Sequence, residues 1–186
     1  MKKLYSILIL VAFCIFGTTA QTINKQRGTE NLLNHNCLSE GTQILMANET
    51  MVNIENIRKG NTIVVFDPAQ QVYTTRQVKD IHLSAHARVY RLTLKDGTQI
   101  ITTDDHPFLT PDGWKSLSPE KTKKNKNYNQ VWEYGIGDDI YIYDTDARTS
   151  STLVMIEGII ETTRTYSLEL DGDGAYIANY MLAGQE

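Results

Sequence analysis

The amino-acid sequence predicts an all-β domain. Short runs of β-branched, aromatic and aliphatic residues recur from residue 43 onward. Turn-forming residues such as Asn48, Asp67-Pro68 and Asp96-Gly97 separate these runs. Regularly spaced short strands of this kind are typical of all-β domains. The same order of strand motifs then occurs a second time, which is the second observation that favours this class.

Strands are expected in the first half of the chain at residues 43–46, 62–66, 71–75, 89–94 and 98–102. Residues 51–58 carry Val52, Ile54 and Ile57 ahead of Gly60, a pattern that predicts one short helical turn. Residues 119–129 contain four lysines. We expect these residues to form a solvated surface loop between the two halves.

Two sequence motifs each occur twice, in the same order. Residues 60–67 read GNTIVVFD, and residues 137–144 read GDDIYIYD. Residues 89–97 read VYRLTLKDG, and residues 165–172 read TYSLELDG. Repetition at matching spacing predicts two similar β-subdomains related by a pseudo-two-fold axis.

The first 20 residues have the composition of a secretory signal peptide. Lys2 and Lys3 precede an apolar run over residues 4–16, and small residues follow up to Ala20. A membrane anchor is the alternative, but this run is shorter than the roughly 20 apolar residues that a membrane span needs. We expect cleavage near Ala20 and a secreted or periplasmic protein, with no membrane span in the mature chain.

Residues 21–36 are polar and aperiodic, which predicts a short flexible leader ahead of a domain at residues 37–186. The formal charge of −4 gives no electrostatic argument for binding nucleic acid. Cys14 leaves with the signal peptide, so Cys37 has no disulfide partner within the mature chain. An unpaired cysteine in an oxidising compartment is a liability unless it is buried or used. We therefore expect Cys37 to have a chemical role.

The position of Cys37 suggests an acyl shift. Its thiol can attack the carbonyl of Asn36 through a five-membered ring and move the acyl group from nitrogen to sulfur. A held intramolecular nucleophile reaches effective molarities on the order of 10⁵ to 10⁸ M. The amide nitrogen must be protonated as it leaves, and His106, with a pKa near its ordinary value, is the candidate acid. Thr103 is expected to donate a hydrogen bond that polarises or strains the bond between Asn36 and Cys37.

Three motifs resemble those of the Hint family, which the autoprocessing domain of Hedgehog proteins and inteins share. Residues 37–44, CLSEGTQI, are similar to the opening motif of the family, whose cysteine is the first residue of the domain. Residues 102–108, TTDDHPF, match its Thr-x-x-His motif at Thr103 and His106. Residues 166–182 are similar to its closing strand.

The resemblance covers residues 37–185. It implies the Hint fold, in which two pseudo-two-fold related β-subdomains form a flattened horseshoe-like disc. It also implies an N-to-S acyl shift at Cys37, assisted by Thr103 and His106. The substrate would be the chain's own N-terminal segment, cut once between Asn36 and Cys37. Water or an external thiol or amine nucleophile would accept the acyl group, and no cofactor is implied.

The chain departs from the family pattern near its C-terminal end. Gln185 stands at the position that matches the family's terminal asparagine, and Glu186 offers no hydroxyl or thiol for ligation. Ser167 stands where many inteins carry an aspartate, and Gly174 where some carry a histidine. We therefore expect thioester-mediated cleavage before Cys37 without full splicing.

Two other functions agree with the sequence. A degenerate Hint fold, retained as a secreted binding or structural module, would leave the bond before Cys37 intact. A cysteine peptidase acting in trans would use Cys37 and His106 on foreign substrates over many turnovers.

No metal site is expected. His82 and His86 have the spacing of a helical metal site, but no acidic or cysteine ligand accompanies them in the sequence. Residues 171–174 are similar to the start of a calcium loop, yet Leu182 stands where the final glutamate of such a loop is required.

Overall fold

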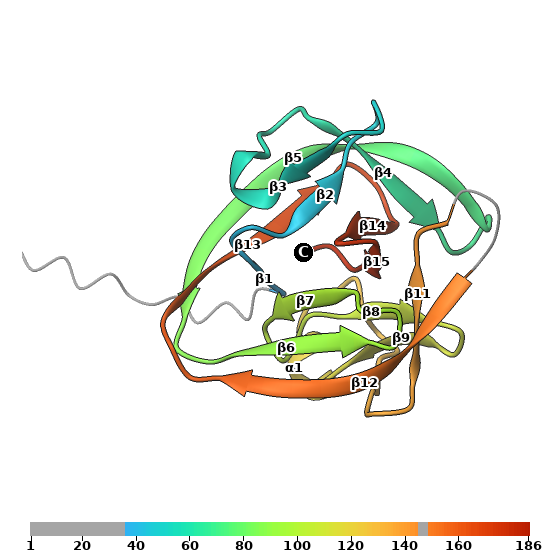
Figure 1. Cartoon of the computed structure of the whole chain (residues 1–186). Coiled ribbons are helices and arrows are strands. Elements are labelled where there is room, and N and C mark those ends of the chain that lie inside the picture. The colour runs from blue at the N-terminus through green and yellow to red at the C-terminus, as the bar shows by residue number, and fades with distance from the viewer. Residues whose placement is uncertain (1–35, 145–148) are drawn as a thin grey trace, which may run out of the picture. The chain divides into compact units, whose positions relative to one another are not determined.

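The computed structural model describes residues 36–144 and 149–186 (Figure 1). The predicted signal peptide and residues 21–35 of the predicted leader lie outside the described residues. Within the described part of the chain, no helix combines the length and the apolar character that crossing a bilayer requires.

Strands make up most of the described residues, which confirms the predicted all-β class. The first strands are β1 (Leu38–Ser39), β2 (Gln43–Leu45), β3 (Met51–Asn53), β4 (Thr62–Asp67), β5 (Val72–His86), β6 (Val89–Leu94) and β7 (Gln99–Thr102). They are followed by β8 (Phe108–Thr110), β9 (Gly113–Ser116), β10 (Trp132–Glu133), β11 (Asp139–Ile142), β12 (Thr149–Ile159), β13 (Thr163–Leu170), β14 (Ala175–Ala178) and β15 (Met181–Ala183). Two helical turns, η1 (Ile54–Asn56) and α1 (Pro119–Thr122), complete the described elements.

The expected strands are present, with one large difference in length. β5 continues well beyond the strand expected at residues 71–75 and ends at His86. Its second part is rich in charged and histidine residues, so apolar alternation does not reveal it, and pairing with β13 holds it extended. The helical turn expected in residues 51–58 is present as η1, where Ile54 is buried.

The predicted repeat is visible in equivalent backbone hydrogen bonds. Gly60 and Gly137, which open the two copies, both have positive φ angles of 84° and 103°. Each glycine N–H donates to a carbonyl in the next long strand, and the same strand residue donates back to the residue after the glycine. These bonds are Gly60–Val78 and Val78–Asn61 (each 2.8 Å), then Gly137–Leu153 (2.9 Å) and Leu153–Asp138 (2.8 Å).

The two halves exchange their long strands. β4 and β5 form one antiparallel pair, and β11 and β12 form the equivalent pair. β5 then pairs with β13 of the second half, while β12 pairs with β6 of the first half. Figure 1 shows β13 beside β5 and β6 beside β12. Each half therefore completes its strand pairing with a strand from the other half.

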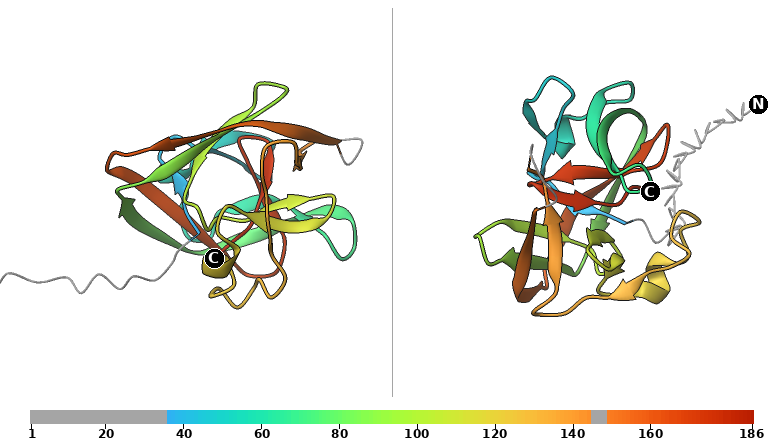
Figure 2. Two further views of the ribbon diagram at one scale, coloured as in Figure 1. Left: turned by 90° about the horizontal axis from the view of Figure 1, so that it is seen from below. Right: turned by 90° about the vertical axis from the view of Figure 1, so that its right-hand side faces the viewer.

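The short strand β1 lies between strands of both halves. Leu38 pairs with Thr102 of β7 on one side and with Tyr166 of β13 on the other. The C-terminal strands, in red, lie among these elements in the right-hand view of Figure 2. This insertion places Cys37, the residue before β1, where the two copies of the repeat meet.

Repeat positions supply much of the core. Leu92 and Leu94 of β6 match Leu168 and Leu170 of β13, and all four are buried in one apolar cluster. Burying one such side chain stabilises a protein by about 1.5–3 kcal/mol. The duplicated sequence therefore contributes equivalent side chains to a single core.

Residues 119–129 differ from the expected solvated loop. Their lysines are exposed, as expected, but Thr122 and Tyr128 are buried. Thr122 Oγ1 donates to the backbone carbonyl of Asp105 at 2.7 Å, and the Tyr128 ring packs edge-on against Trp114. The expectation is therefore wrong for the buried part of the segment, because the loop packs on the domain.

The two positive-φ glycines give a test of the repeat. We expect Gly60→Ala and Gly137→Ala each to lower the free energy of unfolding by about 1–2 kcal/mol, because an L side chain disfavours this backbone conformation. An added Cβ would meet no atom within 4 Å at either position, so a clash is not the cause. Urea denaturation measures the change. Gly135→Ala, where φ is not positive and the space is equally open, is the matched control, and an equal loss there would contradict the explanation.

Candidate active site

Cys37 immediately precedes β1 and is 0% exposed. Two consecutive threonines at the end of β7 hold its peptide groups. The Cys37 N–H donates to Thr103 Oγ1 at 3.0 Å, and the Thr103 N–H donates to the Cys37 carbonyl at 3.0 Å. Thr102 Oγ1 also donates to this carbonyl at 3.2 Å. The amide between Asn36 and Cys37 is therefore held in one orientation.

Thr103 lies beside that amide, but it accepts a hydrogen bond where donation was expected. The reason is that an amide nitrogen carries a hydrogen and has no available lone pair. The hydroxyl of Thr103 has a long donor contact of 3.4 Å to the Cys37 carbonyl. It also hydrogen-bonds with the carboxylate of Asp105.

Asp105 also belongs to this site, although it is not among the residues predicted from the sequence. Its side chain is buried, and this burial raises the pKa of the carboxyl group, against the hydrogen bond from Thr103, which lowers it. Only its place inside the Thr-x-x-His motif points to it, since the motif leaves this position unspecified.

His106 is fully buried beside two aromatic rings, at centroid distances of 5.2 Å from Phe108 and 6.3 Å from Tyr176. Burial lowers the pKa of the imidazole to about 3, so the ring is neutral at physiological pH. The expectation of an ordinary pKa is therefore wrong, because desolvation dominates. The backbone of Asn36 lies near enough to raise this pKa, against the larger effect of burial. Neither ring nitrogen has a hydrogen bond of normal geometry among the described residues.

The thiol of Cys37 faces hydroxyl groups of β13. Thr165 pairs with Ser39 in the β1–β13 ladder, and Ser167 is two residues further along. Burial raises the pKa of the thiol to about 12, an effect that hydrogen bonding with Thr165 and Ser167 opposes. Thr165 Oγ1 also lies 2.7 Å from Nδ1 of His86, whereas Ser167 Oγ has no hydrogen bond of normal geometry in the described structure. At pH 7 only about one thiol in 10⁵ is ionised at such a pKa, so the thiol needs a base.

The C-terminal residues reach the same site. The Asn36 N–H donates to Oε2 of Glu186 at 3.1 Å. The side-chain amide of Gln185 is engaged at both ends: Oε1 accepts from the Leu170 N–H at 2.9 Å, and Nε2 donates to the Gly172 carbonyl at 2.8 Å. Gln185, the predicted counterpart of the family asparagine, is therefore held by its neighbours.

Residues 125–128 hold the backbone of this end. The Gln185 carbonyl accepts from the Tyr128 hydroxyl at 3.0 Å and from Asn125 Nδ2 at 3.4 Å. Asn127 Nδ2 donates to the Glu186 carbonyl at 3.0 Å. No sequence pattern points to these contacts, because they join segments about 60 positions apart.

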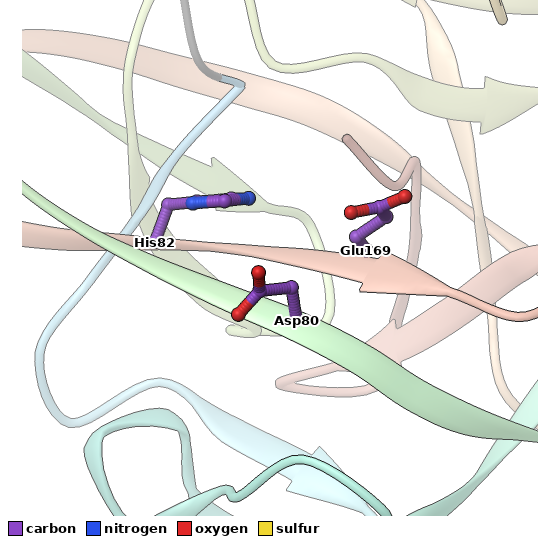
Figure 3. A group of neighbouring side chains, drawn as sticks. All are labelled: Asp80, His82 and Glu169. Carbon is purple, nitrogen blue, oxygen red and sulfur yellow. The ribbon is translucent and has the colours of Figure 1, made fainter.

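His82 and His86 lie on strand β5, so their spacing is not that of a helical metal site. Ligand atoms of Asp80, His82 and Glu169 lie within 4.8 Å of one another, and Figure 3 shows these side chains together on the β5–β13 ladder. The stated reason for expecting no metal, the lack of acidic neighbours, is therefore wrong. The Glu169 carboxylate is already paired with Lys79 Nζ at 2.5 Å, which neutralises part of the charge that would attract a cation.

Solved structures with a similar fold are intein domains. The 2.0 Å crystal structure of a DnaB intein from Synechocystis sp. PCC 6803 has a TM-score of 0.69 and 19% identity, covering 81% of this chain and 99% of that chain. The solution structure of a bacterial intein-like domain from Clostridium thermocellum has a TM-score of 0.65 and 20% identity, covering 81% and 98%. The gp41-1 intein crystal structure has a TM-score of 0.61 and 21% identity, also covering 81% and 98%. The chain therefore has the Hint fold, as predicted.

Sequence comparison adds partial matches. No protein-family model matches the chain. The replication factor C small subunit of Methanocaldococcus jannaschii is 31% identical over 90 residues, 44% of this chain. The DNA-directed RNA polymerase III subunit rpc2 of Dictyostelium discoideum is 32% identical over 84 residues, 42% of this chain. In each case the chain spans only 5% of the relative's length, so the names of these long proteins do not describe this domain.

Buried His106 predicts a loss of stability in mild acid. Its pKa is about 3 in the folded protein, compared with about 6.5 for an unperturbed histidine in the unfolded chain. The unfolded state therefore takes up the proton first, and stability falls as the pH drops below about 6.5 toward 3. From pH 7 to pH 5 we expect this residue to lower the free energy of unfolding by about 2 kcal/mol, measured by urea denaturation. His106→Phe should lose about 2 kcal/mol less than the natural chain over that interval, and equal losses would contradict a buried neutral ring.

Proposed function

We propose that this chain is an autoprocessing Hint domain that cleaves its own Asn36–Cys37 bond through a thioester. The main support is the way this bond is held. Asn36 and Cys37 are 1% and 0% exposed, the Cys37 N–H is bound to Thr103, and the Asn36 N–H is bound to Glu186. A peptide bond fixed beside a thiol is pre-organised for intramolecular attack.

The first step is an N-to-S acyl shift. The thiolate sulfur of Cys37 adds to the carbonyl carbon of Asn36 and gives a tetrahedral intermediate. The carbon–nitrogen bond then breaks, the acyl group stays on sulfur, and the nitrogen gains one proton to become the free amine of Cys37. Thr103 holds this nitrogen in the amide. Once the nitrogen becomes pyramidal and has a lone pair, the Thr103 hydroxyl can donate to it.

A neutral His106 suits a role beside the Asn36 peptide. A neutral imidazole offers one N–H donor and one acceptor nitrogen. Neither has a normal hydrogen bond among the described residues, which costs free energy in a buried ring. Charge that develops on the reacting peptide would give the N–H a partner, so the ring would stabilise the transition state more than the resting amide.

Cleavage completes the reaction. The thioester passes to water or to an external thiol or amine, which releases the segment that ends at Asn36 and leaves a domain that begins at Cys37. We propose cleavage without full splicing, because the Gln185 amide nitrogen is engaged by the Gly172 carbonyl and the side chain of Glu186 has no hydroxyl or thiol for ligation.

From the composition of residues 1–20 we also propose export of the protein to the periplasm or the medium.

Burial separates this proposal from a peptidase that acts in trans. A foreign peptide would have to reach a thiol that is 0% exposed, whereas the Asn36 carbonyl is covalently next to it. The other alternative, a degenerate Hint fold retained as a binding or structural module, differs in leaving the bond intact.

The intact mass of the chain over time, with and without dithiothreitol, tests the proposal. We expect loss of the segment that ends at Asn36, faster with the thiol because it attacks the thioester. Cys37→Ala should abolish cleavage, and Thr103→Val should slow it by about 10²-fold, since it removes the hydroxyl that holds the amide.

Cys14→Ala is the matched control and should cleave at the rate of the natural chain. A mass that stays constant under all conditions would contradict autoprocessing and favour a binding module. Repeated cleavage of an added foreign protein would instead favour a peptidase.

A further inference from the structure

We infer that Thr165 and His86 form a proton relay that deprotonates the Cys37 thiol. This inference rests on the proposed function, because the relay has a task only if Cys37 attacks Asn36. It gives His86 a role that neither the Thr-x-x-His motif nor a metal site provides.

Strand register brings the three groups to one face. Thr165 of β13 pairs with Ser39 on one side and with Ser84 of β5 on the other. Side chains of directly paired residues lie on the same face of a sheet, as do those two residues apart. Cys37 precedes Ser39 by two residues, and His86 follows Ser84 by two. Thr165 therefore lies between the thiol and the imidazole.

The Thr165 hydroxyl contacts both groups. Its Oγ1 lies 2.7 Å from Nδ1 of His86, and it lies close enough to the Cys37 thiol to lower the pKa of that thiol by hydrogen bonding. A hydroxyl donates one hydrogen while accepting another. If Thr165 accepts from the thiol and donates to Nδ1, a continuous path leads from sulfur to His86. This path uses the neutral imidazole tautomer with its hydrogen on Nε2.

The relay gives the proton a route to solvent. Cys37 and Thr165 are buried, whereas His86, at the end of β5, is only half-buried. The proton of the thiol moves to Thr165 Oγ1 as the hydroxyl hydrogen of Thr165 moves to His86 Nδ1. The thiolate is thereby formed, Thr165 keeps one hydrogen, and the imidazolium can exchange its proton with water.

Other groups near the thiol are less suited to this task. The pKa of His106 is about 3 because of burial, which makes the ring a poor base. The Asp105 carboxylate hydrogen-bonds with Thr103. Ser167 has no hydrogen bond of normal geometry that would carry a proton onward within the described residues.

The test measures cleavage before Cys37 in the full chain at saturating dithiothreitol, so that thioester formation limits the rate. General base catalysis typically contributes about 10²- to 10⁴-fold. We therefore expect His86→Ala and Thr165→Val each to slow cleavage by about 10²-fold. Added imidazole should restore the rate of His86→Ala at least about fivefold by filling the vacated base position, but should not rescue Thr165→Val. Thr165→Ser, which keeps the hydroxyl, should stay within about threefold of the natural chain.

His82→Ala is the matched control, since His82 lies on the same strand and face but pairs with Ser167 in the β5–β13 ladder, and it should leave the rate unchanged. Cleavage of His86→Ala at the natural rate, or equal slowing in His82→Ala, would overturn the relay while leaving autoprocessing intact. If Thr165→Val fails to fold, imidazole rescue of His86→Ala and the activity of Thr165→Ser decide the matter. Absence of cleavage in the natural chain would overturn the proposed function and the relay together.

Discussion

The pair of backbone and hydroxyl hydrogen bonds between Cys37 and Thr103 is the interaction on which the site depends. β1 has only two residues, so its pairing with β7 and β13 is short and relies on these contacts. They place the Asn36 peptide against Glu186, the thiol near Thr165, and His106 near the backbone of Asn36. Because β7 and β13 come from different halves of the duplication, the site exists only when both halves have assembled.

Burial sets the protonation states at this site. The pKa of the Cys37 thiol is raised to about 12 and the pKa of His106 is lowered to about 3, so both groups are neutral in the resting protein. Two neutral groups avoid the large cost of a buried unpaired charge. They also leave the thiol unreactive until a proton is removed. In this account the chemistry is limited by proton transfer, which is why hydroxyl groups that connect the buried thiol to a half-exposed histidine matter.

Much of the fold follows from local sequence. Strand alternation, the Gly60 and Gly137 motifs and the close spacing of Thr103 and His106 are all short-range patterns, so they can be recognised in the sequence. Thr165 and His86 are 79 positions apart, and their contact depends on the register of β13 against β5, which no local pattern specifies. The pKa of His106 could not be anticipated because it depends on how completely other segments cover the ring. The buried part of residues 119–129 was missed for the same reason, since exposed lysines dominate its sequence.

The central claim is that the acyl group of Asn36 moves from the nitrogen of Cys37 to its sulfur. Asn36–Cys37 is the only place in the sequence where an asparagine directly precedes a cysteine. Selective labelling with carbonyl-¹³C asparagine and ¹⁵N cysteine therefore isolates this one bond in an NMR spectrum. The account predicts that the one-bond ¹³C–¹⁵N coupling disappears with time in the natural chain. The ¹³C signal should move to the position of a thioester and then to that of the released acid. Both changes should occur before the bond between residues 36 and 37 is hydrolysed in Cys37→Ser. Persistence of the coupling in the folded natural chain would contradict the account.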